Sequence, residues 1–368
     1  MKKKGKIVLC AVLAVLIVAG AVTWCFLPHP LSYPINSIEP VGSQVTVTED
    51  GEDCVTVCKE TEGDFKILMF TDLHLDGKNA TSKLTVSHLV ENIQREKPDL
   101  VLLGGDNVTS GLNRIRAKQL GKIFEKLGVY WAGVLGNHEG DNPWSITRTE
   151  MAEIFSSFDH CLMRRGAEEI DGDCNYALSI VNSGGQMLET FYFLDTFDEM
   201  SDATRAEYAV PADASEYDGA HANQVAWFTA KAAALNARYG AFKSVLLMHI
   251  PLPQVAAAAE AGNFAFGGKL ENVCCTGFDS GLFDAAKAAG VEAVFCGHDH
   301  LNTFGVMYEN VLLSYIEPSG YGSYTTASRL GYEEKDWLQG YTVLTVHANG
   351  GFTQQQVRNS ELQTGEVA

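Results

Sequence analysis

The sequence has little positive charge. It holds 27 lysines and arginines against 46 aspartates and glutamates, which gives a formal net charge of -19. A chain of this kind has no general basic surface, so broad binding to nucleic acid is excluded. An anionic substrate would therefore have to be attracted by local positive charge, and bound metal ions can supply it. Internal repeats and long low-complexity tracts are also absent, while a hydrophobic content of 46% indicates a folded chain.

Cysteine spacing does not indicate a zinc ribbon. The chain has nine cysteines, an odd number, and Cys54 and Cys58 lack a second pair at the right distance. If the protein lies outside the cytoplasm, Cys54 with Cys58 and Cys161 with Cys174 are candidate disulfides. The alternative is that most of the cysteines are small buried apolar residues.

The N-terminus predicts export. Four lysines among the first six residues precede an apolar run from Ile7 to Leu27 that contains no charged residue. As a helix with a rise of about 1.5 Å per residue, this run would span about 30 Å, the thickness of a bilayer core. Because positive charge stays in the cytoplasm, the rest of the chain is expected outside it. Residues 1–27 are therefore expected to be a single-pass membrane anchor, or a cleaved signal peptide that leaves a secreted protein.

Three further regions follow this segment. Prolines break regular structure early in residues 28–63, which we interpret as a linker with edge strands, because Val41 to Val57 alternates between apolar and polar residues. Residues 64–358 form the expected main domain. The polar residues 359–368 are expected to be a flexible tail.

Within the main domain, short apolar runs alternate with amphipathic patterns. The runs have the length and composition of buried strands, and they cover 65–70, 100–103, 129–135, 245–248 and 291–296. Helical spacing is present at 84–97, 116–127, 224–239 and 282–289. This alternation predicts an α/β sheet with helices on its faces. A last strand pattern, Tyr341 to His347, precedes the turn signal Asn349-Gly350-Gly351.

Each of the five predicted strands is followed by potential metal ligands. In chain order these are Asp72-Leu-His74, Gly-Asp106, Gly-Asn137-His138-Glu, the lone His249, and Gly-His298-Asp-His300. Because ligands in open α/β sheets bind beyond the carboxyl ends of strands, we expect the five loops to converge on one site. The glycines at 105, 136 and 297 are expected to permit sharp turns and close approach of the backbone.

The mixture of imidazole and carboxylate ligands indicates Zn, Mn, Fe or Co, because Ca prefers oxygen ligands alone. Each motif has an ordinary alternative: Asp-x-His and Gly-Asp are common in loops, and His249 alone could be a core histidine. The ordered set of five is much more specific than any member. The remaining histidines have no partner at ligand spacing, and we interpret them as surface or packing residues: His29, His88, His160, His221 and His347.

This series of motifs resembles the calcineurin-like metallophosphoesterase superfamily. All five blocks are present in the order of that family, and the resemblance covers most of residues 65–350. It implies a β-sandwich of two mixed sheets flanked by helices. It also implies two divalent metal ions, a phosphate-ester substrate and hydrolysis without a covalent intermediate.

The resemblance also implies a role for each matching residue. One ion would be held by Asp72, His74, Asp106 and His300. The other would be held by Asp106, Asn137, His249 and His298, so that Asp106 bridges the two ions. His138 would not bind metal but would contact the phosphoryl group, beside Asn137, or protonate the leaving oxygen.

Finer features are similar to a purple acid phosphatase-like branch, notably His249-Ile-Pro-Leu-Pro and Gln224-Val-Ala-Trp227. Two positions depart from true purple acid phosphatases, which carry a Tyr where this chain has Thr109 and lack the equivalent of His74. The purple colour is therefore not expected.

The expected function is a membrane-anchored, extracytoplasmic metal-dependent phosphoesterase that acts on phosphomonoesters or phosphodiesters. A non-catalytic phospholigand-binding domain on the same fold is the alternative. Nothing in the sequence identifies the substrate.

Overall fold

The computed structural model describes residues 31–76, 79–109, 111–141 and 144–364 of the chain. The expected membrane segment, 7–27, lies outside these residues. Among the described residues, no helix has both the length and the apolar character that crossing a membrane requires.

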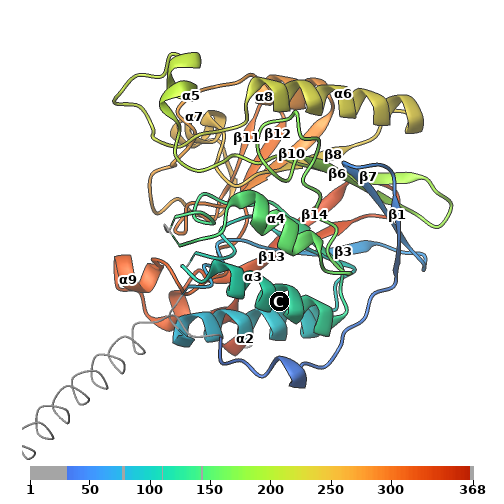
Figure 1. Cartoon of the computed structure of the whole chain (residues 1–368), viewed down its shortest axis with the longest axis vertical. Coiled ribbons are helices and arrows are strands. Elements are labelled where there is room, and N and C mark those ends of the chain that lie inside the picture. The colour runs from blue at the N-terminus through green and yellow to red at the C-terminus, as the bar shows by residue number, and fades with distance from the viewer. Residues whose placement is uncertain (1–30, 77–78, 110, 142–143, 365–368) are drawn as a thin grey trace, which may run out of the picture.

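Two mixed β-sheets form the centre of the fold (Figure 1). The larger sheet has nine strands in the order β1 (Val45–Glu49), β2 (Cys54–Lys59), β6 (Tyr176–Val181), β7 (Met187–Phe193), β8 (Ser244–Leu247), β10 (Val291–Cys296), β12 (Val311–Tyr315), β11 (Gly305–Tyr308) and β9 (Phe264–Phe266). The smaller sheet has five strands in the order β14 (Phe352–Arg358), β13 (Gly340–Val346), β3 (Phe65–Phe70), β4 (Leu100–Leu103) and β5 (Trp131–Gly133).

Helices cover the outer faces of the two sheets. In Figure 1, α6 and α8 lie above the larger sheet, while α2 and α3 lie below the smaller one. The helices are α2 (Asn79–Glu96), α3 (Asn113–Leu127), α4 (Arg148–Ser156), α5 (Asp202–Glu207), α6 (Ala222–Tyr239), α7 (Pro253–Glu260), α8 (Leu282–Ala288), α9 (Thr326–Leu330) and α10 (Asn359–Thr364). Two 3-10 turns, η1 (Ile35–Ser37) and η2 (Glu334–Asp336), complete the set. The expected arrangement of two mixed sheets flanked by helices is confirmed.

The central strands are apolar throughout because both of their faces are buried. In β8, Val245 and Leu247 point into the core between the sheets, whereas Leu246 packs with the residues under α6 and α8. Such strands lack the alternation of a half-exposed strand and appear in the sequence as continuous apolar runs. The parallel pairs β3–β4 and β4–β5 bring the carboxyl ends of three of these strands to the same edge.

Local sequence signals set the ends of the helices on the smaller sheet. Helix α2 ends before Lys97, which has a positive φ of 48°, and Pro98 cannot continue the helix. Helix α3 ends at Gly128, whose φ of 65° is a left-handed cap and whose N–H donates to the carbonyl of Phe124. The four predicted helices correspond to α2, α3, α6 and α8, and their ends agree with the structure to within five residues.

The region that we interpreted as a linker contributes to the larger sheet. Strands β1 and β2 form an antiparallel hairpin, with β1 at the sheet edge, as the alternation of Val41 to Val57 predicted. Strand β2 also pairs in parallel with β6, and Val55 and Val57 are fully buried in the core.

Of the two alternatives for the cysteines, the structure supports the one without disulfides, because the cysteines at 54, 58, 161, 174, 274, 275 and 296 are all free. Cys54 and Cys58 both lie on β2, where four residues of extended chain separate them by about 13 Å, beyond the reach of a disulfide. The expectation of a flexible tail is wrong in part, because residues 359–364 form α10. Asn359 is buried there and accepts a hydrogen bond of 2.9 Å from the side chain of Asn92.

Candidate metal centre

The expected ligands meet where the carboxyl ends of the two sheets face each other. The loops after β3, β4 and β5 bring side chains from the smaller sheet, and the loops after β8 and β10 bring them from the larger one. All seven expected ligands are buried: Asp72, His74, Asp106, Asn137, His249, His298 and His300. The convergence predicted from the strand ends is therefore present.

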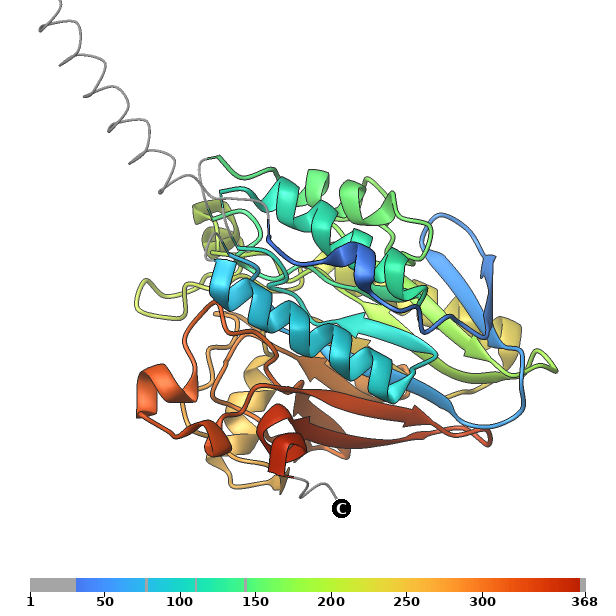
Figure 2. The ribbon, with the colours of Figure 1, turned by 90° about the horizontal axis from the view of Figure 1, so that it is seen from below.

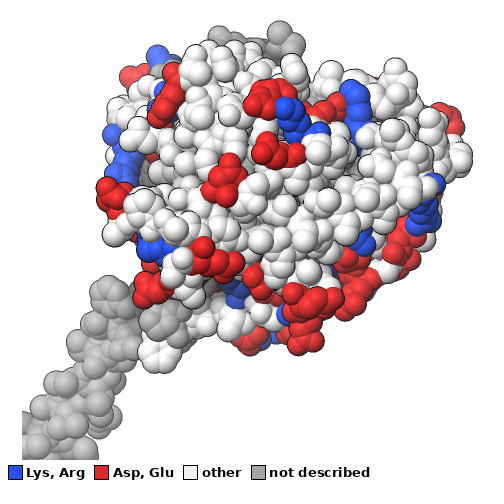
Figure 3. All heavy atoms as spheres, turned by 90° about the horizontal axis from the view of Figure 1, so that it is seen from above, with Lys and Arg blue, Asp and Glu red and all other residues white. Residues whose placement is uncertain are grey.

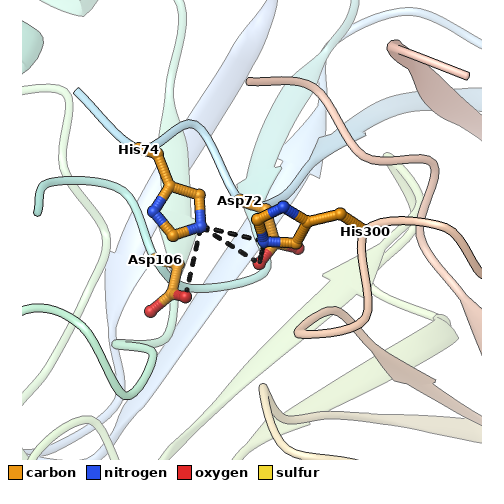
Figure 4. A group of neighbouring side chains, drawn as sticks. All are labelled: Asp72, His74, Asp106 and His300. Carbon is orange, nitrogen blue, oxygen red and sulfur yellow. Dashed lines mark hydrogen bonds and ion pairs between the residues drawn. The ribbon is translucent and has the colours of Figure 1, made fainter. Parts of the chain in front are cut away.

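One group of four side chains has the geometry of a metal site (Figure 4). Asp72, His74, Asp106 and His300 each offer one ligand atom, and these atoms lie within 4.8 Å of one another. The Nε2 atoms of His74 and His300 are 2.9 Å apart. Nε2 of His300 is 3.3 Å from Oδ1 of Asp72, and Nε2 of His74 is 3.4 Å from Oδ2 of Asp106. This group matches one of the two ligand sets that the resemblance implied.

The remaining ligands form a second group that shares Asp106. Nε2 of His249 lies 3.3 Å from Oδ2 of Asp106 and 3.1 Å from the side-chain oxygen of Asn137. Nδ1 of His298 lies 2.8 Å from the same Asn137 oxygen. The carboxylate of Asp106 therefore lies between the two groups.

The partners of the two carboxylates indicate that a cation belongs here. Oδ1 of Asp106 accepts the N–H of His138 at 2.8 Å, and Oδ2 of Asp72 accepts from the hydroxyl of Thr71 at 2.8 Å. The other oxygens, Oδ2 of Asp106 and Oδ1 of Asp72, are buried and have no hydrogen-bond partner. Such atoms cost several kcal/mol unless a positive charge compensates them. Both bare oxygens face ring nitrogens of the histidines, so the donor set fits divalent ions.

Hydrogen bonds to the backbone orient two of the imidazoles. Nδ1 of His249 lies 2.8 Å from the carbonyl of Gly104, and Nδ1 of His300 lies 3.0 Å from the carbonyl of Tyr324. An N–H on each Nδ1 can donate to that carbonyl, which leaves Nε2 of both rings as an acceptor toward the centre. The ring of Tyr324 also stacks on His300, with ring centroids 4.2 Å apart.

Backbone strain is concentrated at the ligands. Four of the expected ligands have a positive φ, with values of 54° at Asp72, 43° at His74, 51° at Asp106 and 80° at His298. Residues with a side chain seldom adopt this conformation, and such strain persists only where the surrounding structure enforces it.

The three glycines singled out in the motifs make the close approach possible. A Cβ at Gly105 would lie 2.5 Å from Nδ1 of His249, and a Cβ at Gly297 would lie 2.1 Å from Oγ1 of Thr71. A Cβ at Gly136 would lie 2.2 Å from Oδ1 of Asp106. Any side chain at these positions would displace a ligand or its support, as the motifs predicted.

His138 lies at the mouth of the centre rather than within it. Its side chain is 42% exposed, and its ring centroid is 5.5 Å from that of His74. Burial lowers the pKa of His138, but the contact of Nδ1 with Asp141 and the charge of Asp106 outweigh this effect and raise the pKa to about 9.

Two supporting residues were missed by the sequence analysis. Glu139 ends the Gly-Asn-His-Glu motif but received no role there. It is buried, and its two oxygens accept the N–H groups of Asn107 at 2.7 Å and Gly136 at 2.9 Å, so it joins the loops after β4 and β5. Burial and the nearby Asp106 raise the pKa of Glu139 to about 7. Arg148 donates to the carbonyl of Gly136 and pairs with buried Asp195, and no motif indicated it.

The other histidines lie outside both ligand groups, as expected. His160 contacts Glu125, His347 contacts Asp64, and His221 contacts Asp171 and Asp218. The ring of His88 packs on Tyr321, while His29 lies outside the described residues.

This fold and this buried cluster of histidines and carboxylates define a class of two-sheet α/β proteins with a metal centre at the strand ends. Residues 65–302 match the family model described as calcineurin-like phosphoesterase. The chain belongs to the calcineurin-like phosphoesterase family.

Curated relatives include plant and yeast proteins. The chain is 28% identical over 310 residues to "Probable inactive purple acid phosphatase 29" of Arabidopsis thaliana, covering 74% of this chain and 75% of that protein. It is 27% identical to "Probable inactive purple acid phosphatase 14" of the same plant, covering 72% of each chain. It is 25% identical to "Phosphatase DCR2" of Saccharomyces cerevisiae, covering 66% of this chain and 45% of that one. The resemblance to the purple acid phosphatase-like branch is therefore confirmed.

Replacing Gly136 by Ala should lower the metal content of the centre. The new Cβ would overlap both Oδ1 and the backbone N of Asp106, so the loop that carries this ligand would have to shift. We expect the metal content, measured by elemental analysis of the purified protein, to fall by at least half. Gly140→Ala is the matched control, because nothing lies within 4 Å of its Cβ. Equal metal content in the two variants would contradict the close approach.

Proposed function

We propose that this chain is a metal-dependent phosphoesterase that hydrolyses phosphomonoesters or phosphodiesters. The observation that carries the proposal is the pair of bare, buried carboxylate oxygens on Asp72 and Asp106, which face ring nitrogens from both ligand groups. Family membership supports the same chemistry.

The ligand sets follow from the two groups. One ion would be held by Asp72, His74, Asp106 and His300, whose ligand atoms lie within 4.8 Å of one another. The other would be held by Asp106, Asn137, His249 and His298. The single Oδ2 atom of Asp106 is close to His74 and to His249, which suits a bridging role. Mn, Fe, Zn and Co all suit these ligands.

When bound, two such ions would neutralise the charge of the substrate phosphate and lower the pKa of water toward neutrality. The side chains of Asn137 and His138 would contact the phosphoryl group at the mouth of the centre. The contact of Nδ1 with Asp141 favours the protonated imidazole of His138, which can donate its proton to the leaving oxygen. Asp141 holds the ring in place through Nδ1. Neither ligand group includes a serine or cysteine, and hydrolysis needs no covalent intermediate.

The alternative is a domain on this fold that binds phosphate ligands without hydrolysing them. Two of the relatives carry the word "inactive" in their names. This chain retains all seven ligands in a converging arrangement, and this completeness favours hydrolysis.

The location of the protein belongs to the proposal as well. The lysines at 2, 3, 4 and 6 and the uncharged run 7–27 support a single-pass anchor with the catalytic domain outside the cytoplasm. Cleavage of this segment would instead yield a secreted enzyme.

Hydrolysis of p-nitrophenyl phosphate and of its bis ester by the purified full-length protein tests the activity. EDTA should abolish the release of p-nitrophenol, and added Mn²⁺ or Zn²⁺ should restore it. Asp106→Asn should remain inactive with added metal, because it removes the shared negative ligand. A wild-type protein that contains two ions but hydrolyses neither ester would contradict the proposal and favour the binding domain.

His138→Ala should separate catalysis from metal binding. The side chain faces the mouth and holds no metal, so the metal content should match that of the wild type. Loss of a positioned proton donor should lower kcat by about 100-fold or more. His160→Ala is the control, since His160 contacts Glu125 away from both ligand groups. Unchanged kcat in His138→Ala would remove the role given to this residue.

A further inference from the structure

Several apolar side chains near the metal-centre edge of the fold are exposed. Leu84, Ile115, Trp144 and Leu330 are 39%, 37%, 87% and 42% exposed, and we call this group the apolar rim. Figure 2 shows the N-terminal ends of α2 and α3 and the whole of α9 at one end of the molecule. Helices α2 and α3 follow the ligand-bearing loops after β3 and β4, and Tyr324, just before α9, stacks on His300. The rim and the metal centre therefore lie at the same edge of the fold.

Trp144 is close in the chain to a segment that contacts the first turn of α3, where Ile115 is located. The N–H of Ile146, two residues after Trp144, donates to the side-chain oxygen of Asn113 at 3.0 Å. The side chain of Asn113 in turn donates to the carbonyl of Glu139 at 2.7 Å, next to His138. Trp144 and Ile115 are therefore both close in the structure to the loop that carries His138.

Three exposed lysines lie near two of the rim residues. Lys83 precedes Leu84 on α2. Lys118 and Lys122 are exposed on α3 and follow Ile115 at helical spacing. None of the three lysines forms an ion pair with the residues that the structure describes. By contrast, clusters of acidic side chains lie on the face seen from the side of α6 and α8 (Figure 3).

The described chain also begins at this edge. The N–H of Leu31 donates to Oε1 of Gln119 on α3 at 3.0 Å, and Nε2 of Gln119 donates to the carbonyl of Leu31 at 3.2 Å. Arg116 donates to the same Gln119 oxygen at 3.0 Å and to the carbonyl of Asp76 at 2.9 Å. Asp76 is two residues after His74, so hydrogen bonds connect the start of the described chain to a ligand loop.

The length of chain before Leu31 limits how far this edge can lie from a membrane. Four residue-to-residue steps separate Leu27, the last residue of the apolar run, from Leu31. With about 3.8 Å between consecutive Cα atoms, the two residues can be at most about 15 Å apart. If 7–27 crosses the bilayer, the side of α3 that binds Leu31 must lie close to the membrane surface.

We propose that the metal centre opens toward the membrane that anchors the chain and acts on a phosphate ester carried by a lipid. This proposal rests on the phosphoesterase function and the anchor proposed above. Trp144 and Ile115 lie among the lipid headgroups, where tryptophan is favoured, and Lys83, Lys118 and Lys122 face anionic headgroups. The rim thereby brings the headgroup phosphate of a lipid to His138 and the ligand loops.

Quenching of tryptophan fluorescence tests the orientation. Full-length protein would be reconstituted in vesicles of phosphatidylcholine and phosphatidylglycerol, with and without bromine on the upper acyl chain. The emission of Trp144 is the difference between the wild type and Trp144→Phe. The brominated lipid should lower this emission at least twofold. Trp227→Phe is the control, because Trp227 lies on α6 and donates its indole N–H to Asp53. Unquenched Trp144 emission would overturn the proposed orientation. This is also the result expected if a protein partner, and not lipid, covers this surface.

Hydrolysis in the same vesicles tests the substrate class. Phosphatidic acid is the monoester probe, and phosphatidylglycerol is the diester probe. The double change Ile115→Ser and Trp144→Ser should lower kcat/KM on the preferred lipid about tenfold but leave hydrolysis of soluble p-nitrophenyl phosphate unchanged. Equal effects on lipid and soluble esters, or no hydrolysis of either lipid by an enzyme active on the soluble ester, would overturn the lipid substrate. Inactivity on the soluble esters would instead count against the phosphoesterase function, and the quenching result would still decide the orientation.

Discussion

The structure depends on one buried carboxylate oxygen. Oδ2 of Asp106 lies 3.4 Å from Nε2 of His74, which follows a strand of the smaller sheet. It lies 3.3 Å from Nε2 of His249, which follows a strand of the larger sheet. An isolated buried carboxylate is costly, so this arrangement is stable only when positive charge lies between these groups. Binding of metal ions here would therefore be coupled to the relative placement of the two sheets at this edge.

The loops at this edge hold the carboxylate of Asp106 and the other ligands in place. The loops reach the carboxylate through strained backbone at the ligands themselves and through glycines that leave no room for a side chain. Glu139 and Arg148 then fix the loop that carries Asn137 and His138, by binding its N–H and carbonyl groups. The same edge carries the apolar rim and receives the chain at Leu31, so the chemistry and the proposed contact with the membrane share one side of the molecule.

Much of the centre was predictable because its ligands follow strands that are recognisable as apolar runs. The strands at 65–70, 100–103 and 291–296 have the predicted bounds, and the ligands after them converge. The division into two sheets was implied by the family resemblance and not by the residues, because apolar runs do not specify which strands pair. Strands β6 and β7 were missed because no ligand motif follows them and because polar residues, Ser179 in β6 and Glu189 and Thr190 in β7, interrupt their apolar runs. Arg148 was missed because its role depends on contacts between distant parts of the chain. The sequence left the cysteine pairing open, because it did not show that Cys54 and Cys58 share one extended strand.

Anomalous X-ray scattering from crystals soaked in Mn²⁺ tests the central claim most directly. The account predicts two peaks, one among Asp72, His74 and His300 and one among Asn137, His249 and His298, with the carboxylate of Asp106 between them. A single peak that makes no contact with Asp106, or no peak at this edge of the sheets, would contradict it.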